Sequence, residues 1–117
     1  MRYLLLIYNR DAEWAGRTAA EQPAVLAEYR AFTQTLEAAG QLQGGNALEA
    51  SSTATMVRVR DGKVLTTDGP FAETKEQLIG FYLVEAKDID EALAIAARIP
   101  GARWGAIEVR PVRQMGG

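Results

Sequence analysis

Short apolar runs alternate with amphipathic stretches along this chain of 117 residues. Residues 3–8 (YLLLIY) and 78–84 (LIGFYLV) are almost continuously apolar, the pattern of strands that are covered on both faces. Residues 42–48, with a glycine pair, and residues 105–110 have the length and composition of two further strands. The pattern therefore predicts two strands that are covered on both faces.

A hairpin is predicted in the middle of the chain. Residues 53–60 (TATMVRVR) alternate between apolar and polar positions, and a second extended run follows at residues 63–67. Between them stand Asp61 and Gly62, a pair that favours a tight two-residue turn. These strands carry more charge than the apolar runs, which indicates greater exposure to water.

Two helices are expected, each with its own start signal. Thr18 and Glu21 have the spacing of a capping box, and Gly40 is suited to end the helix that follows. The apolar positions of this helix are Val25, Tyr29, Phe32 and Leu36. Asp88 is a candidate N-cap for the second helix, which Pro100 ends. The apolar positions of the second helix are Ile89, Ala92, Leu93, Ala96 and Ile99.

The order of these elements, without the hairpin, is the βαββαβ order of the ferredoxin-like α+β fold in a single domain. Two helices cover only one face of a sheet, yet the first strand and the strand at residues 79–84 are apolar on both faces. A second copy of the same sheet is the simplest cover for the other face, which predicts a homodimer in the form of a dimeric α+β barrel. The alternative is a monomer in which the hairpin and loops fold over that face.

The composition narrows the range of functions. Lys and Arg number 13 and Asp and Glu number 15, so the formal net charge of −2 offers no broad cationic surface for nucleic acid. The chain contains neither cysteine nor histidine. This composition excludes thiolate chemistry, Cys-ligated zinc and imidazole bases, and no carboxylate cluster has metal-ligand spacing. No metal, other cofactor or nucleic acid is expected.

The first residues do not predict a targeting or membrane segment. Their apolar core spans only residues 3–8, and no small-residue cleavage site follows it. Such a run is too short for a secretory signal or a membrane span. We therefore expect a cytoplasmic protein without a membrane partner.

The string DGPFAETKE, at residues 68–76, resembles the signature of the DGPF branch of the YCII-related superfamily. The preceding DGKVL and the final EVRPV extend the resemblance to nearly the whole chain. The resemblance implies the dimeric α+β barrel. It also implies a possible association with extracytoplasmic-function sigma factors, beside which members of this branch occur. Founding YCII-like proteins carry a His–Asp pair in a cleft, but this chain has no histidine to fill that role.

The DGPFAETKE segment is also the candidate ligand site. Asp68 begins it with turn chemistry, and an acceptor, a hydroxyl and a cation follow within a few residues. The predicted ligand-binding residues are Tyr8, Asp11, Phe71, Glu73, Thr74 and Lys75. Any proton transfer has to use carboxylates, lysine or tyrosine, and Asp68 is the candidate catalytic base. A base of this kind needs partial burial, which Phe71 and the mouth of the barrel would supply.

Two functions are compatible with these features. One is a homodimeric protein that binds a small polar molecule in a cleft at the DGPFAETKE loop, with or without acid–base turnover. The other is a non-catalytic regulatory protein that acts with a sigma factor. Glu108 and Arg110, on one face of the last strand, are a candidate ion pair between the two chains of the dimer.

Overall fold

A computed structural model describes residues 1–10, 12, 16–70 and 75–115. Its elements are β1 (Arg2–Asn9), α2 (Glu21–Ala38), β2 (Leu42–Ala47), the 3-10 helix η1 (Ser51–Thr53), β3 (Thr55–Arg60), β4 (Lys63–Asp68), β5 (Gln77–Glu85), α3 (Ile89–Ala97), the 3-10 helix η2 (Pro100–Arg103) and β6 (Ala106–Pro111). Four strands form an antiparallel sheet in the order β2-β5-β1-β6, and β3 pairs with β4 alone. The arrangement is a ferredoxin-like α+β fold.

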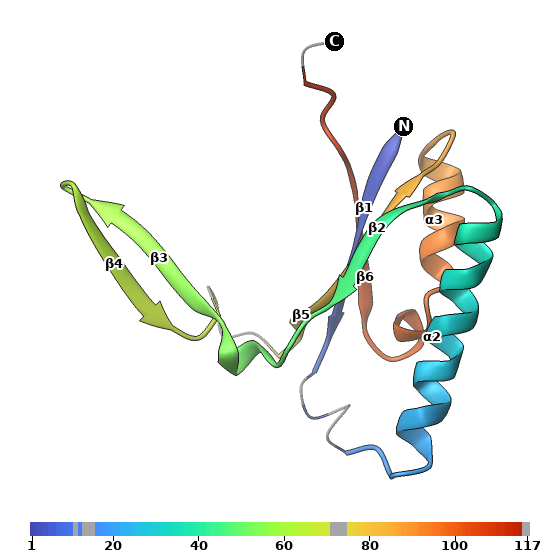
Figure 1. The fold of residues 1–117 in the computed structure, drawn as a ribbon, viewed down its shortest axis with the longest axis horizontal. Coiled ribbons are helices and arrows are strands. Elements are labelled where there is room, and N and C mark those ends of the chain that lie inside the picture. The colour runs from blue at the N-terminus through green and yellow to red at the C-terminus, as the bar shows by residue number, and fades with distance from the viewer. Residues whose placement is uncertain (11, 13–15, 71–74, 116–117) are drawn as a thin grey trace.

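Both helices pack on the same face of the four-stranded sheet (Figure 1). The core lies between these two layers. From β1, the side chains of Tyr3, Leu5 and Ile7 point into the core, and Leu5 is completely shielded from solvent. The helices contribute the buried side chains Phe32, Leu36, Ala92, Ile95 and Ala96. Alternate residues of the central strand therefore hold the helix layer in place.

The local signals in the sequence set the ends of both helices. The Thr18 hydroxyl accepts a hydrogen bond from the Glu21 amide, and the Glu21 carboxylate accepts one from the Thr18 amide. Gly40 follows α2 with φ +69°, a left-handed conformation that glycine adopts readily. At the second helix, the Asp88 carboxylate accepts a 2.9 Å hydrogen bond from the Glu91 amide.

The turn after η2 lies directly against the end of β1. A Cβ atom at Gly105 would be 2.2 Å from the backbone oxygen of Tyr8, far closer than atoms can approach. A Cβ atom at Gly101 would lie 2.6 Å from the hydroxyl of Tyr29, which accepts a hydrogen bond from the Gly101 amide. Because these two glycines have no side chain, the turn can pack against the sheet and place β6 beside β1.

The other face of the sheet is apolar as well. We call this surface the open face and define it by the residues of β1, β5 and β6 whose side chains point away from the core. They are Leu4, Leu6, Tyr8, Leu78, Phe81, Leu83, Ala106, Glu108 and Arg110. The six residues of β1 and β5 in this set are half-buried. Neither of the two helices described lies over this face (Figure 1).

The β3–β4 hairpin extends away from the body of the molecule. Its strands contact little besides each other, and it leaves the sheet on the side opposite to the helices (Figure 1). The radius of gyration is 16.3 Å. A compact domain of this length has roughly 13 Å. The hairpin therefore does not fold over the open face within its own chain, as the monomeric alternative requires.

The close approach at Gly105 gives a testable prediction for stability. Gly105→Ala should lower the melting temperature by several degrees, because the new methyl group collides with the Tyr8 backbone oxygen. Overpacking of this kind costs about 1–3 kcal/mol. The matched control is Gly44→Ala, whose Cβ would lie at an ordinary 3.9 Å from Leu83. Equal melting temperatures for the two variants, measured by circular dichroism, would contradict the prediction.

Candidate functional site

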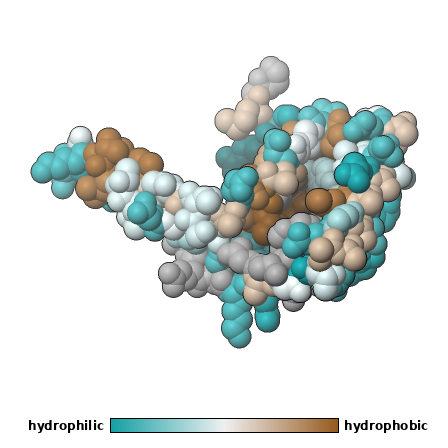
Figure 2. All heavy atoms as spheres, turned by 60° about the horizontal axis from the view of Figure 1, so that its bottom comes forward, coloured by the Kyte–Doolittle hydropathy of each residue, from teal (hydrophilic) through white to brown (hydrophobic). Residues whose placement is uncertain are grey.

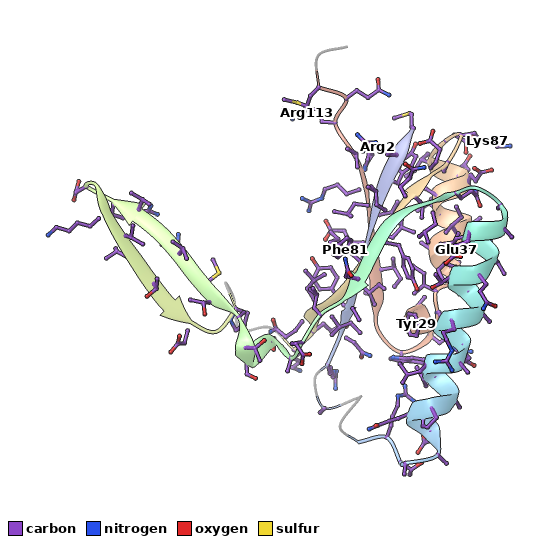
Figure 3. The ribbon with its side chains drawn as sticks, viewed as in Figure 1. Arg2, Tyr29, Glu37, Phe81, Lys87 and Arg113 are labelled. Carbon is purple, nitrogen blue, oxygen red and sulfur yellow. The ribbon has the colours of Figure 1, made fainter. Side chains whose placement is uncertain are left out.

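The centre of the open face is a bed of large apolar side chains. The register of β1 against β5 pairs Leu4 with Leu83 and Leu6 with Phe81. Phe81 points away from the helix layer, whereas Tyr29 lies on the helix side (Figure 3). Such a bed gives the flat face of a ligand, or the side chains of another sheet, a surface to pack against.

Three polar side chains stand together at one side of this bed. β6 pairs with β1 so that Glu108 lies opposite Leu6 and Ala106 lies opposite Tyr8. Glu108 is therefore the diagonal neighbour of Tyr8 on the same face of the sheet. The Tyr8 hydroxyl donates a 3.1 Å hydrogen bond to the Glu108 carboxylate oxygen Oε1. The other carboxylate oxygen, Oε2, accepts from the Nε (3.1 Å) and Nη2 atoms of Arg110. We call Tyr8, Glu108 and Arg110 the polar array.

The polar array determines which of its members carry charge. Hydrogen bonds from Arg110 and then Tyr8 lower the pKa of the Glu108 carboxyl below its ordinary value of 4.5. Burial, followed by the hydrogen bond to the carboxylate, raises the pKa of the Tyr8 phenol above 10.0. Near neutral pH the array therefore contains a carboxylate, a guanidinium and a neutral phenol.

The predicted ligand residues are distributed between described and undescribed parts of the chain. Tyr8 lies on the open face, at the end of β1 beside Leu78, where β5 begins. Asp68 ends β4, and Lys75 precedes β5; both are exposed in the single chain. The described residues of the single chain thus do not provide the shielding that a base role for Asp68 requires. The other predicted residues, Asp11, Phe71, Glu73 and Thr74, lie outside the described residues.

The expectation for β6 concerned two chains. The sequence suggested Glu108 and Arg110 as an ion pair between two chains, and within the single chain they form an ion pair with each other. Both residues are on the same face of β6, two positions apart, so the guanidinium reaches back along the strand to the carboxylate. The bond from Tyr8 to Glu108 was not predicted, because the register between the first and last strands is not visible in either segment alone.

A concave region lies on the helix side of the molecule. It is an open hollow of about 400 Å³ lined by Glu28, Ala31, Ala97, Arg98, Ile99, Pro100 and Arg103. Arg103 forms an ion pair with Glu28, and Arg98 donates a 2.7 Å hydrogen bond to the Thr35 hydroxyl. These polar groups therefore have partners within the chain, and the described ligand candidates Tyr8, Asp68 and Lys75 do not line this hollow.

Two further findings concern metals and membranes. Within the described residues, no three Asp or Glu side chains are grouped closely enough to hold a metal ion. The helices in the same part of the chain are too short or too polar to cross a bilayer.

Comparison with known proteins places this fold in a family. The profile of the YCII-related domain matches residues 1–116. The chain belongs to the YCII-related family. An uncharacterized protein of Rhizobium meliloti (strain 1021), R00369, is 36% identical over 114 residues, covering 96% of this chain and 92% of that protein.

This YCII-related protein is also similar to a solved enzyme structure. The enzyme is 5-chloro-2-hydroxyhydroquinone dehydrochlorinase (TftG) from Burkholderia phenoliruptrix AC1100, in complex with 2,5-dihydroxybenzoquinone. The match has a TM-score of 0.59, covers 97% of this chain and 94% of that chain, and has 17% sequence identity. At this identity the likeness establishes a shared fold.

The electrostatics of the polar array can be tested by titration. Because the folded protein lowers the pKa of Glu108, the stability that its carboxylate contributes is present above pH 4.5 and is lost as the pH falls through the lowered pKa. Arg110→Ala should raise the pKa of Glu108 towards its ordinary value, as measured by carboxyl carbon NMR. Arg30→Ala, which removes an equal charge from the helix layer, should leave it unchanged. An unchanged value in Arg110→Ala would refute the assigned cause.

Proposed function

We propose that this YCII-related protein is a homodimeric, cytoplasmic, single-domain protein of the DGPF branch that binds a small polar molecule on the open face of its sheet. The loop between Asp68 and Lys75 borders the site. The observation that carries the proposal is the polar array, which lies on an otherwise apolar sheet face outside the helix layer. A few polar groups beside an apolar bed are the common chemistry of small-molecule sites.

The chemistry of the face favours a planar ligand that carries oxygen atoms. Leu6 and Phe81 offer an apolar surface for a ring, and Arg110 offers a cation beside it. The related fold of TftG was solved with 2,5-dihydroxybenzoquinone, a ring with carbonyl and hydroxyl oxygens. This compound is therefore a suitable first probe. Its oxygens would accept hydrogen bonds from Arg110, and its ring would lie on the apolar bed.

In the single chain, the charge state of the polar array supports binding of a ligand. Proton transfer by the array requires that a second sheet cover the open face. A general base works best when its pKa is near the working pH, whereas Arg110 and Tyr8 lower that of Glu108. A second sheet over the open face would remove water from the array and raise the pKa of its carboxylate. Glu108 then joins Asp68 as a candidate base, with Tyr8 as the neighbouring proton donor.

The proposed dimer is tested by its mass. Multi-angle light scattering at micromolar concentration should give about twice the chain mass of 12.7 kDa. The physical reason is that the apolar open face needs a cover that the described part of the chain does not provide. A mass of a single chain under these conditions would overturn the sheet-to-sheet dimer.

The proposed site is tested by binding of 2,5-dihydroxybenzoquinone, followed by calorimetry and thermal shift. Arg110→Ala should weaken binding at least about tenfold, because hydrogen bonds to charged groups contribute roughly 1.5–3 kcal/mol. Tyr8→Phe and Glu108→Gln should weaken it less, since they disturb the orientation of the guanidinium rather than remove it.

Glu37→Gln on the helix layer is the control and should bind as the unchanged protein does. Equal affinity in Arg110→Ala and in this control would remove the open face as the site. If turnover of the probe is found, Asp68→Asn and Glu108→Gln decide which carboxylate is the base. Normal turnover in one of them dismisses that residue.

A further inference from the structure

One face of the hairpin, which we call the valine face, carries three exposed valines. In the register of β3 against β4, Val59 pairs with Val64 and Val57 with Thr66, so these side chains lie on the same face. Val57 and Val59 are each 59% exposed and Val64 is 68% exposed. Figure 2 shows hydrophobic atoms gathered on the hairpin, well separated from the main body. The other face of the hairpin carries the cations Arg58, Arg60 and Lys63, together with Met56, Leu65 and Thr67.

Such a hairpin is not expected to be stable by itself. An isolated two-stranded sheet is marginal in water, and it becomes stable when one of its faces packs on another surface. Neither β3 nor β4 makes extensive contact with any other described element. No other described element of the chain covers this hairpin, which we call the arm, so we expect its cover to come from another molecule.

The position of the arm limits what can cover it. The arm leaves the body on the side opposite to α2 and α3, which is the side of the open face (Figure 1). The open face and the arm thus lie on the same side of the molecule (Figure 1). An identical chain packed against the open face would lie in the space between them.

We propose that the arm clasps the second copy of the chain, with Val57, Val59 and Val64 packed on the partner, and that the partner's arm does the same in return. This inference rests on the proposed sheet-to-sheet dimer. A second copy of the chain suits this role because a two-fold axis makes every contact occur twice. The open faces pack on each other, and each arm packs on the other chain. The cations Arg58, Arg60 and Lys63 face away from the valine face, and charged side chains on an arm of this kind discourage open-ended pairing of its edges.

The clasp connects assembly with the ligand site. Asp68 is the last residue of β4, and the amide of Gly69 donates a 2.7 Å hydrogen bond to the carbonyl of Ala54 at the other strand. The base of the arm is therefore closed where the loop that borders the site begins. Docking of the arm on the partner fixes the position of Asp68, so the site is complete only in the dimer.

A triple variant, Val57→Thr with Val59→Thr and Val64→Thr, tests the clasp. Threonine keeps the branched shape that suits a strand, and the three positions are exposed within the chain, so folding of the protomer should be little affected. The dimer dissociation constant, measured by sedimentation, should rise at least about tenfold, which corresponds to 1.4 kcal/mol. The control is Leu26→Gln with Leu93→Gln, two similarly exposed apolar residues of the helix layer, which should leave the constant unchanged.

Hydrogen exchange of the unaltered protein provides the second measurement. The amides of β3 and β4 should exchange slowly well above the dissociation constant and fast well below it. If the protein is a monomer at all accessible concentrations, the proposed dimer fails and the clasp fails with it. If a dimer forms whose affinity is unchanged in the triple variant and whose arm exchanges equally fast at every concentration, the clasp alone is wrong.

Discussion

The architecture depends on one constraint: a four-stranded sheet with apolar side chains on both faces has a helix layer for only one of them. Leu5 and its neighbours on the core side are shielded by α2 and α3. Leu4, Leu6 and Phe81, on the other side, are only half-buried. The hydrophobic effect favours covering this second surface, because removal of apolar area from water stabilises roughly in proportion to that area. The arm lies on the side of this uncovered surface (Figure 1), and the polar array lies on the surface itself.

Placing polar groups on a surface that is to be covered is costly unless they satisfy one another. The polar array meets this condition, since the Glu108 carboxylate accepts hydrogen bonds from both Tyr8 and Arg110. Its internal bonds reduce the penalty for excluding water. They also leave the guanidinium with donors that are not used by Glu108, because Arg has five N–H groups in a fixed geometry. In the proposed dimer, this one arrangement would serve both the packing of the two sheets and the recognition of a ligand.

Most elements of the fold could be predicted because their signals are local. Thr18 and Glu21, Gly40, and Asp88 fix the ends of helices within a few residues of themselves, and the structure confirms these three signals. The polar array could not be predicted in this way. Tyr8 and Glu108 lie near opposite ends of the chain, and only the register of β6 on β1 brings them together. That register depends on the whole core and on the turn at Gly105.

The candidate site at the DGPFAETKE loop was predictable only as a location. The loop joins the arm to β5, and β5 begins beside Tyr8, so the topology brings Tyr8 and the start of β5 to the same end of the sheet. The surroundings of Asp68 and Lys75 are a different matter. In the proposed dimer they depend on contacts between chains, and the pattern of a single sequence predicts the existence of such contacts far better than their geometry.

The sheet order also has a consequence for synthesis of the protein. β1 is made first, but it is hydrogen-bonded to β5 and β6, which are made last. Its apolar residues therefore have no partner strand until most of the chain has left the ribosome. Contacts between residues far apart in sequence slow folding, and unpaired apolar strands promote aggregation in the meantime. The central strand of the native sheet is thus the segment for which the nascent chain has most need of a chaperone.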